Sequence, residues 1–170
     1  MLPIRCCLAL CLLATLAVPS NAAAQDRGIT LGLLGGVGGS PDSEDYTESS
    51  FQFLAGLDIA TRTHVQLRLG QLDLALDGRT TDLSYVTLGS EYRFDADYYD
   101  SGIILGLGWY QLDGSAGVAD EDSIGVYGGV TGDFPINDRW SVLVELTGHW
   151  ADLDAAQVFL HGHVGLAIHF

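Results

Sequence analysis

Polar and apolar residues alternate along most of this chain with a period of two, and this pattern constrains the fold more than any other feature. Between residues 140 and 150, most odd positions are polar, and the even positions hold Trp, Val, Val, Leu, Gly and Trp. No window from Ile29 onward shows the 3.6-residue period of an amphipathic helix. Because successive side chains of a strand point to opposite faces, the alternation predicts an all-β protein. The eight predicted strands cover residues 28–38, 51–60, 65–76, 85–94, 102–112, 124–134, 140–150 and 158–170.

Two kinds of sheet could carry this pattern, and they differ in where the apolar face points. In a soluble sandwich or lipocalin-like barrel it points inward, whereas in a transmembrane barrel it faces lipid. The polar face here is rich in glycine, which suits the narrow lumen of an eight-stranded barrel. Trp140 and Trp150 share the apolar face, and at about 3.3 Å per residue and a tilt near 40° their separation spans roughly 25 Å, the height of a lipid-facing band. The sequence therefore predicts an eight-stranded antiparallel up-and-down transmembrane β-barrel.

Aromatic residues are expected at both edges of the lipid-facing band. The connections should alternate in length, with long loops at 39–49, 77–82, 113–123 and 151–157 and mostly shorter turns at 61–63, 95–101 and 135–139. The apolar parity shifts across Gln71, which we interpret as a β-bulge or as the strand continuing past the membrane rim. The predicted girdle residues are Phe94, Trp109, Phe134, Trp140 and Trp150.

Residues 1–24 have the order of a secretory signal: an arginine near the start, an apolar run, and small residues before the predicted cleavage site. A membrane-spanning helix is the alternative, but the apolar run falls short of the roughly 20 residues that a span requires. Cys6, Cys7 and Cys11 all lie in this segment. The predicted barrel domain, residues 25–170, therefore has no cysteine for a disulfide, for thiol catalysis or for a thiolate metal site.

The charge balance excludes one class of partner. The chain carries 22 acidic against 7 basic residues, for a formal net charge of -15, and all of the basic residues are arginine. Such a chain has almost nothing with which to bind phosphates along a backbone, so nucleic-acid binding is excluded.

The end of the chain carries the pattern of a known family. His163, Gly165, Ile168 and Phe170 have the polar, glycine, apolar and terminal aromatic spacing of the C-terminal insertion signal of bacterial outer-membrane barrels. Residues 137–142 resemble the last periplasmic turn and following strand of the small OmpA-like and OmpX-like outer-membrane β-barrel family. The resemblance implies export and folding into the outer membrane of a Gram-negative cell by the barrel-assembly machinery, with lipid and lipopolysaccharide as surroundings. It implies no particular activity, because the family is functionally heterogeneous.

Charged residues of both signs lie on the predicted lumen face, where a low dielectric requires them to be paired. A paired network is the favoured interpretation, and a conducting or gated pore is the alternative. Arg68 and Glu91, on adjacent strands, are the first predicted pair. The predicted network comprises Asp58, Arg68, Glu91, Arg93, Asp133 and Glu145.

Three histidines also have the inward parity. If the last hairpin pairs position 149 with 161, then His149, His161 and His163 gather near the outer rim, where three imidazoles could bind zinc. The favoured alternative is that they are ordinary lumen residues bonded to neighbouring side chains or water. A lipid A deacylase or acyltransferase would also use a histidine here, but no serine follows on that strand.

The predicted outer loops are acidic and would repel lipopolysaccharide phosphates unless divalent cations bridge them. We therefore expect no cofactor beyond weak Ca²⁺ or Mg²⁺ binding, and a merely solvated acidic surface is the simpler alternative. The candidate ligands are Asp42, Glu44, Asp45 and Glu48 in one loop and Asp120, Glu121 and Asp122 in another.

Together these features predict a monomeric, non-enzymatic outer-membrane barrel that acts in envelope structure or surface interaction through its acidic loops. The alternatives are a lipid A-modifying enzyme, a small porin-like channel and a soluble periplasmic ligand-binding barrel.

Overall fold

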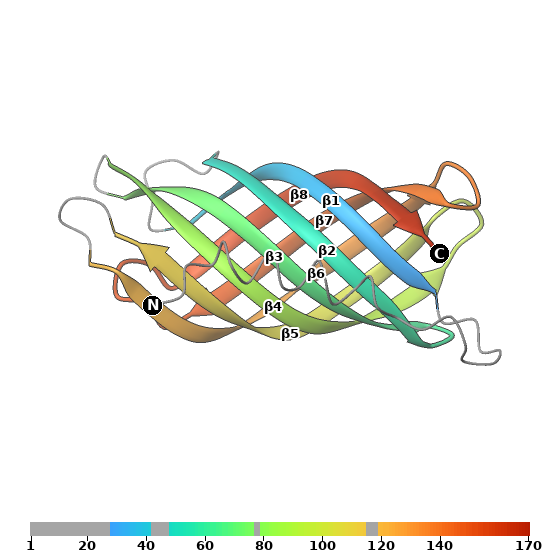
Figure 1. Cartoon of the computed structure of the whole chain (residues 1–170), viewed down its shortest axis with the longest axis horizontal. Helices are drawn as coiled ribbons and strands as arrows, with labels where there is room; N and C mark the ends of the chain where they lie inside the picture. Colours follow the sequence, from blue (N-terminus) through green and yellow to red (C-terminus); the bar gives the residue numbers. More distant parts are fainter. Residues whose placement is uncertain (1–27, 42–47, 77–78, 115–118) are drawn as a thin grey trace.

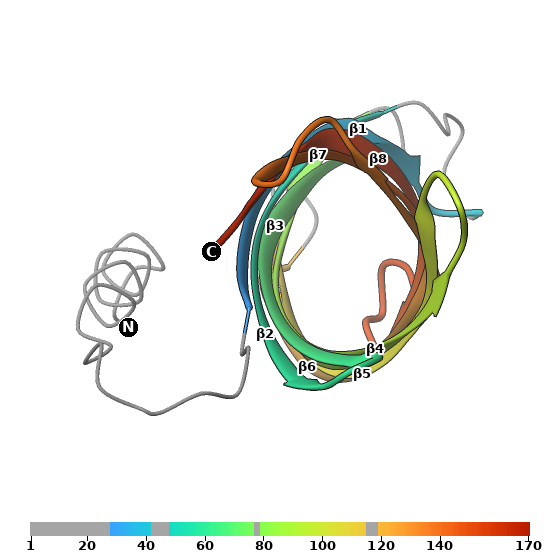
Figure 2. The ribbon, with the colours of Figure 1, turned by 90° about the vertical axis from the view of Figure 1, so that its right-hand side faces the viewer.

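The computed structural model describes residues 28–41, 48–76, 79–114 and 119–170, with side chains for all of these except 75–80. The predicted signal segment lies outside the described residues. Eight strands form one closed antiparallel barrel in which each strand pairs with the next and β8 pairs with β1 (Figures 1 and 2), which confirms the predicted fold class. The strands are β1 (Ile29–Gly39), β2 (Glu48–Ala60), β3 (Thr63–Leu76), β4 (Arg79–Asp95), β5 (Asp100–Asp113), β6 (Glu121–Pro135), β7 (Trp140–Ala151) and β8 (Val158–His169).

The two ends of the chain close the barrel. The backbone N–H of Phe170 donates to the carbonyl of Ile29 at 2.9 Å, and that of Ile29 donates back to Phe170 at 3.3 Å. Further along the same seam, a Cβ at Gly165 would collide with the backbone carbonyl of Leu33 on β1. Glycine at this position lets β1 and β8 approach closely enough to pair.

The apolar parity faces outward. Leu33, Leu105 and Leu146 are 66%, 68% and 60% exposed, whereas Arg68 and Thr87 on the other parity are almost fully buried. A soluble barrel would show the reverse, so the architecture is that of a transmembrane barrel. Within the described residues no helix has the length and apolar character needed to cross a bilayer. The predicted girdle residues are all on the outer surface: Phe94, Trp109, Phe134, Trp140 and Trp150.

The connections define two ends, which we call the turn end and the loop end. The turn end carries the connections 61–62, 96–99 and 136–139 together with Phe170, and it lies on the right in Figure 1. The loop end carries 40–47, 77–78, 114–120 and 152–157. The predicted long loop at 77–82 is wrong, because β4 begins at Arg79, directly opposite Leu76. The alternation of long and short connections therefore fails at this hairpin.

The predicted bulge at Gln71 is also wrong. Pairing continues without interruption through Gln71, which lies opposite Phe51 on β2 and Ser84 on β4. Leu72 and Leu74 have the inward parity and are completely buried. The shift in apolar parity after Gln71 thus reflects a change in the lumen, which becomes apolar where β3 continues beyond the outward apolar band. This agrees with the interpretation that the strand continues past the membrane rim.

Candidate functional site

An apolar cluster fills the lumen at the loop end, and we call it the apolar cap. Leu153 and Ala156 belong to the connection between β7 and β8, which curls inside the outline of the ring in Figure 2. Burial of these side chains against one another excludes water from this end of the lumen. The cap was not predicted, although its strand residues share the parity of the polar lumen residues. Its ten residues are Leu72, Leu74, Leu83, Tyr85, Tyr110, Leu112, Ala151, Leu153, Ala156 and Phe159.

A buried ion pair crosses the middle of the lumen. Arg68 on β3 and Glu145 on β7 lie four strands apart in the ring, on opposite walls, and both are buried. Arg68 Nη2 donates to Glu145 Oε1 at 2.7 Å and Nη1 to Oε2 at 3.1 Å. Gln52 Nε2 donates to the same carboxylate at 2.9 Å. The predicted Arg68–Glu91 pair is wrong, because Arg68 lies opposite Thr87 on β4 and its long side chain reaches across the lumen instead.

Five of the six predicted network residues form one connected chain of contacts. Gln66, which the sequence analysis missed, accepts a hydrogen bond from Arg68 and donates to Glu91 Oε2 at 2.6 Å. Glu91 also accepts from Arg93 Nε at 3.0 Å. Arg93 in turn lies 3.8 Å from Asp133. The sixth residue, Asp58, stands apart and pairs with His64.

The three lumen histidines do gather, between the ion pair and the apolar cap. The ring centroids of His149 and His161 are 4.5 Å apart, and those of His161 and His163 are 5.5 Å apart. The expected pairing of 149 with 161 is wrong, since His149 lies opposite Phe159. Two of the histidines have hydroxyl partners at 2.9 Å: Tyr110 Oη for His149 Nδ1 and Ser50 Oγ for His163 Nε2.

These histidines do not form a metal centre. Among the described residues, no three His, Cys, Asp or Glu side chains are placed to hold a metal ion. Tyr85 packs edge-on against His161, and Tyr127 stacks on His149. The tyrosines share the inward parity of the histidines, so the signal for this aromatic layer was present in the sequence.

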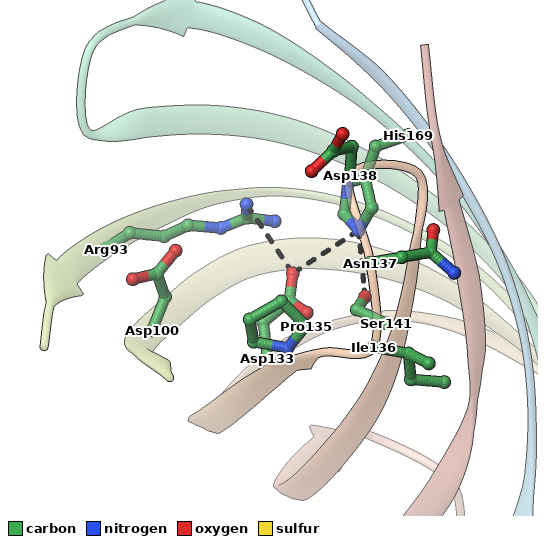
Figure 3. A pocket seen from close by; sticks show the side chains of 9 residues that line it. All are labelled: Arg93, Asp100, Asp133, Pro135, Ile136, Asn137, Asp138, Ser141 and His169. Carbon is green, nitrogen blue, oxygen red and sulfur yellow. Dashed lines mark hydrogen bonds and ion pairs between the residues drawn. The ribbon is translucent and has the colours of Figure 1, made fainter. Parts of the chain in front are cut away.

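A pocket of about 480 Å³ opens at the turn end, and we call it the mouth pocket (Figure 3). Of its residues, the sequence analysis singled out only Arg93 and Asp133. They face each other across the pocket in Figure 3, with His169 on the other side of Asp133. The pocket is lined by Arg93, Asp100, Asp133, Pro135, Ile136, Asn137, Asp138, Ser141 and His169.

Ser141 and His169 in this pocket do not form a catalytic triad with Asp133. Ser141 Oγ lies 2.8 Å from His169 Nε2, but the other ring nitrogen meets the hydroxyl of Thr30 at 3.1 Å. Asp133 lies 3.7 Å from the nitrogen that already contacts the serine. A nucleophile triad requires the acid on the opposite ring nitrogen, where it orients the imidazole.

The structure describes only some of the predicted acidic ligands at the loop end. Asp42, Glu44 and Asp45 lie outside the described residues, and Glu48 begins β2. Asp122 is exposed on β6. Two of the acids accept hydrogen bonds from backbone N–H groups. Asp120 accepts one from Gly114 at 2.9 Å, and Glu121 accepts one from Asp154 at 2.7 Å.

A row of carboxylates runs around the outside of the barrel at this end. Asp82 lies directly opposite Asp73 on β3 and Asp113 on β5. The parity of the three strands places all three side chains on the outer face, beyond the Trp109 level and therefore outside the lipid-facing band. Partial burial, followed by the charges of Asp73 and Asp113, raises the pKa of Asp82 above its usual value. The sequence analysis missed this row because strand register is needed to see it.

The residues of the predicted insertion signal occupy different surroundings. His163 faces the lumen, Gly165 lies against β1, and Ile168 pairs with Trp140 of β7. Phe170 is 70% exposed at the turn end.

Comparisons with known proteins agree with this architecture. No family model matches the sequence, and no curated protein matches it. Among solved structures, a major outer membrane protein from Thermus thermophilus has a TM-score of 0.64 at 10% identity, with 86% of this chain and 100% of that chain covered. Neisserial surface protein A has a TM-score of 0.61 at 13% identity, with 88% and 100% covered. The N-terminal β-barrel domain of Pseudomonas aeruginosa OprF has a TM-score of 0.60 at 12% identity, with 86% and 98% covered. The chain therefore has the fold of the small outer-membrane barrels.

Proposed function

We propose that this chain is a closed, non-enzymatic barrel of the bacterial outer membrane that contributes to envelope structure or surface interaction through its acidic loop end. The observation that best supports this proposal is that the outer surface is apolar while side chains fill the lumen. Outward leucines suit a bilayer, and the apolar cap and the Arg68–Glu145 pair occupy the path that a permeating solute would follow. An eight-stranded barrel leaves little room beyond its own side chains.

The fold supports a location in the outer membrane. The three structural neighbours named above are a surface protein, an outer membrane protein and a β-barrel domain, which supports the same location for this chain. In this proposal Phe170, which is exposed, is the aromatic residue that the barrel-assembly machinery would recognise. Lipid and lipopolysaccharide would then surround a monomeric barrel.

The loop end suits interaction more than transport. Its outward carboxylates Asp73, Asp82 and Asp113 are cross-strand neighbours, and in the proposed membrane placement they would lie near the lipid headgroups. Divalent cations between these carboxylates and lipopolysaccharide phosphates would attach the barrel to the outer leaflet, as hard cations prefer oxygen ligands.

The test combines cell fractionation with two measurements on the purified protein. The full chain should sediment with outer membranes, migrate faster on an unboiled gel than after boiling, and be depleted from the membrane when Phe170 is deleted. Reconstituted in planar bilayers, it should show no single-channel steps. A soluble protein with no heat-dependent migration would contradict the membrane location, and regular conductance steps would contradict the closed lumen.

A further inference from the structure

The mouth pocket contains two carboxylates placed side by side. Asp100 on β5 and Asp133 on β6 are direct cross-strand partners, and both line the pocket. Direct partners have Cβ atoms about 4.5–5.5 Å apart, and like charges in this position destabilise a sheet. Asp138 contributes a third carboxylate from the turn after β6. This arrangement becomes favourable when a cation lies between the carboxylates.

The ion pairs of Asp133 with Arg93 and His169 are both long. This residue is only 9% exposed, and its Oδ1 is buried without a hydrogen-bond partner. Its Oδ2 is 3.8 Å from Arg93 Nη1 and 3.7 Å from His169 Nε2, beyond hydrogen-bond distance. Arg93 directs its Nε to Glu91, and both ring nitrogens of His169 meet hydroxyl groups. Because both ion pairs of Oδ2 are long, this oxygen of the pocket lining can accept a shorter hydrogen bond from a further charged donor.

The pocket wall favours an organic cation over a metal ion. Pro135 and Ile136 form an apolar side of the pocket, and Ile136 is 59% exposed. A methylene chain can pack on such a surface while its charged end reaches the carboxylates. The carboxylates of the pocket are not arranged as a metal site, since the described residues contain no such group of three.

We propose that the mouth pocket binds a primary ammonium group carried on an aliphatic chain, either a lysine side chain of a periplasmic peptide or protein or a free alkylamine. Asp133 and Asp100 receive the ammonium group, and Ile136 and Pro135 contact the methylenes. The volume of about 480 Å³ accommodates one such chain. The site faces the end of the barrel opposite to the acidic loops, so it is a second binding function and not part of the surface interaction proposed above.

The experiment uses the full folded barrel in detergent micelles and three probes. Nα-acetyl-lysine methylamide presents a peptide-borne ammonium group, 1,5-diaminopentane presents a free one, and the Nε-acetylated lysine analogue is the uncharged control. Backbone amide NMR shifts of residues 136–141 report binding. The charged probes should produce saturable shifts there and the uncharged analogue none. Binding of the lysine probe alone assigns the site to peptides, and binding of both probes assigns it to amines in general.

Matched variants separate this site from the general negative charge of the barrel. Asp133→Asn should weaken binding by about tenfold or more, the effect of losing one charge-assisted hydrogen bond. Asp100→Asn provides a second test if Asp133→Asn does not fold. Asp122→Asn, an exposed acid at the loop end, is the control and should bind as the parent does. Equal weakening by Asp122→Asn, equal binding of the uncharged analogue, or no saturable shift with either amine would overturn the proposal.

Discussion

Replacement of Arg68 by methionine should strongly destabilise the barrel. The substitution leaves Glu145 buried with only the hydrogen bond from Gln52 Nε2 at 2.9 Å. Breaking a buried ion pair on one side costs about 3–5 kcal/mol, because the remaining charge is uncompensated. Methionine fills much of the arginine volume, so a cavity contributes little to this loss.

The double variant Arg68→Met/Glu145→Leu should be more stable than the single variant. It removes both charges, and the remaining cost is the lost partner of Gln52 and of Gln66, about 1 kcal/mol for each amide. The double variant should therefore lose about 1–3 kcal/mol. The loss in the double variant is compared with the summed losses of the single variants Arg68→Met and Glu145→Leu, and the difference measures the coupling between the two side chains.

The assay is urea unfolding in detergent micelles, followed by tryptophan fluorescence and by migration on unboiled gels. Arg62→Met is the matched control, since Arg62 and Asp95 form a surface pair 3.3 Å apart with side chains 53% and 61% exposed. This control should leave the unfolding midpoint unchanged. Additive losses in the double variant would refute the reasoning, because they would show that Arg68 and Glu145 contribute independently.

Three further outcomes follow from the structure. Phe159→Ala should lower the free energy of unfolding by about 3–5 kcal/mol through a cavity in the apolar cap, measured in the same urea titration. Gly165→Ala should reduce the heat-modifiable folded band on unboiled gels, because its Cβ would meet the carbonyl of Leu33, whereas Gly35→Ala, with open space at the Cβ position, should fold normally. The pKa of Asp82 is raised in the folded barrel, so protonation of this carboxyl stabilises the fold, and the stabilisation is lost as pH rises through the folded pKa. In urea titrations, Asp82→Asn should therefore be more stable than the parent at pH 8 but not at pH 3.

Alternation in the sequence was sufficient to predict the strands, and the glycine-rich polar face with the spacing of Trp140 and Trp150 identified the apolar face as the lipid-facing side. Each residue on a strand faces lipid or lumen according to its parity, so outward side chains such as Leu105 and Trp140 could be assigned one at a time. The hairpin from β3 to β4 was predicted less well, because a strand that leaves the membrane no longer needs apolar residues outside. In β3 the parity of the apolar residues changes at Gln71, but the register of its pairing with β2 and β4 continues unchanged through this residue.

Partners across the lumen could not be predicted in the same way. Sequence adjacency relates neighbouring strands, but Arg68 meets Glu145 from the opposite wall, and this contact depends on the tilt and closure of the whole barrel. Side-chain length adds to the difficulty, since an arginine can bypass Thr87 beside it and reach the far side. The mouth pocket has a similar origin: Asp133 and His169 lie on β6 and β8, which are separated by β7, so their contact depends on the curvature of the sheet and not on strand pairing.

The side chains that fill the lumen form successive layers along the barrel axis, and these layers indicate at which ends partners can bind. The apolar cap closes the loop end, and the connected pairs from Glu145 to Arg93 fill the middle. At the turn end the polar groups remain open to water in the mouth pocket. A barrel filled in this way cannot pass a ligand from one end to the other, because each layer would have to lose contacts that stabilise the fold. In the proposed orientation the loop end faces the outside and the mouth pocket faces the periplasm, so the two ends would bind independent partners.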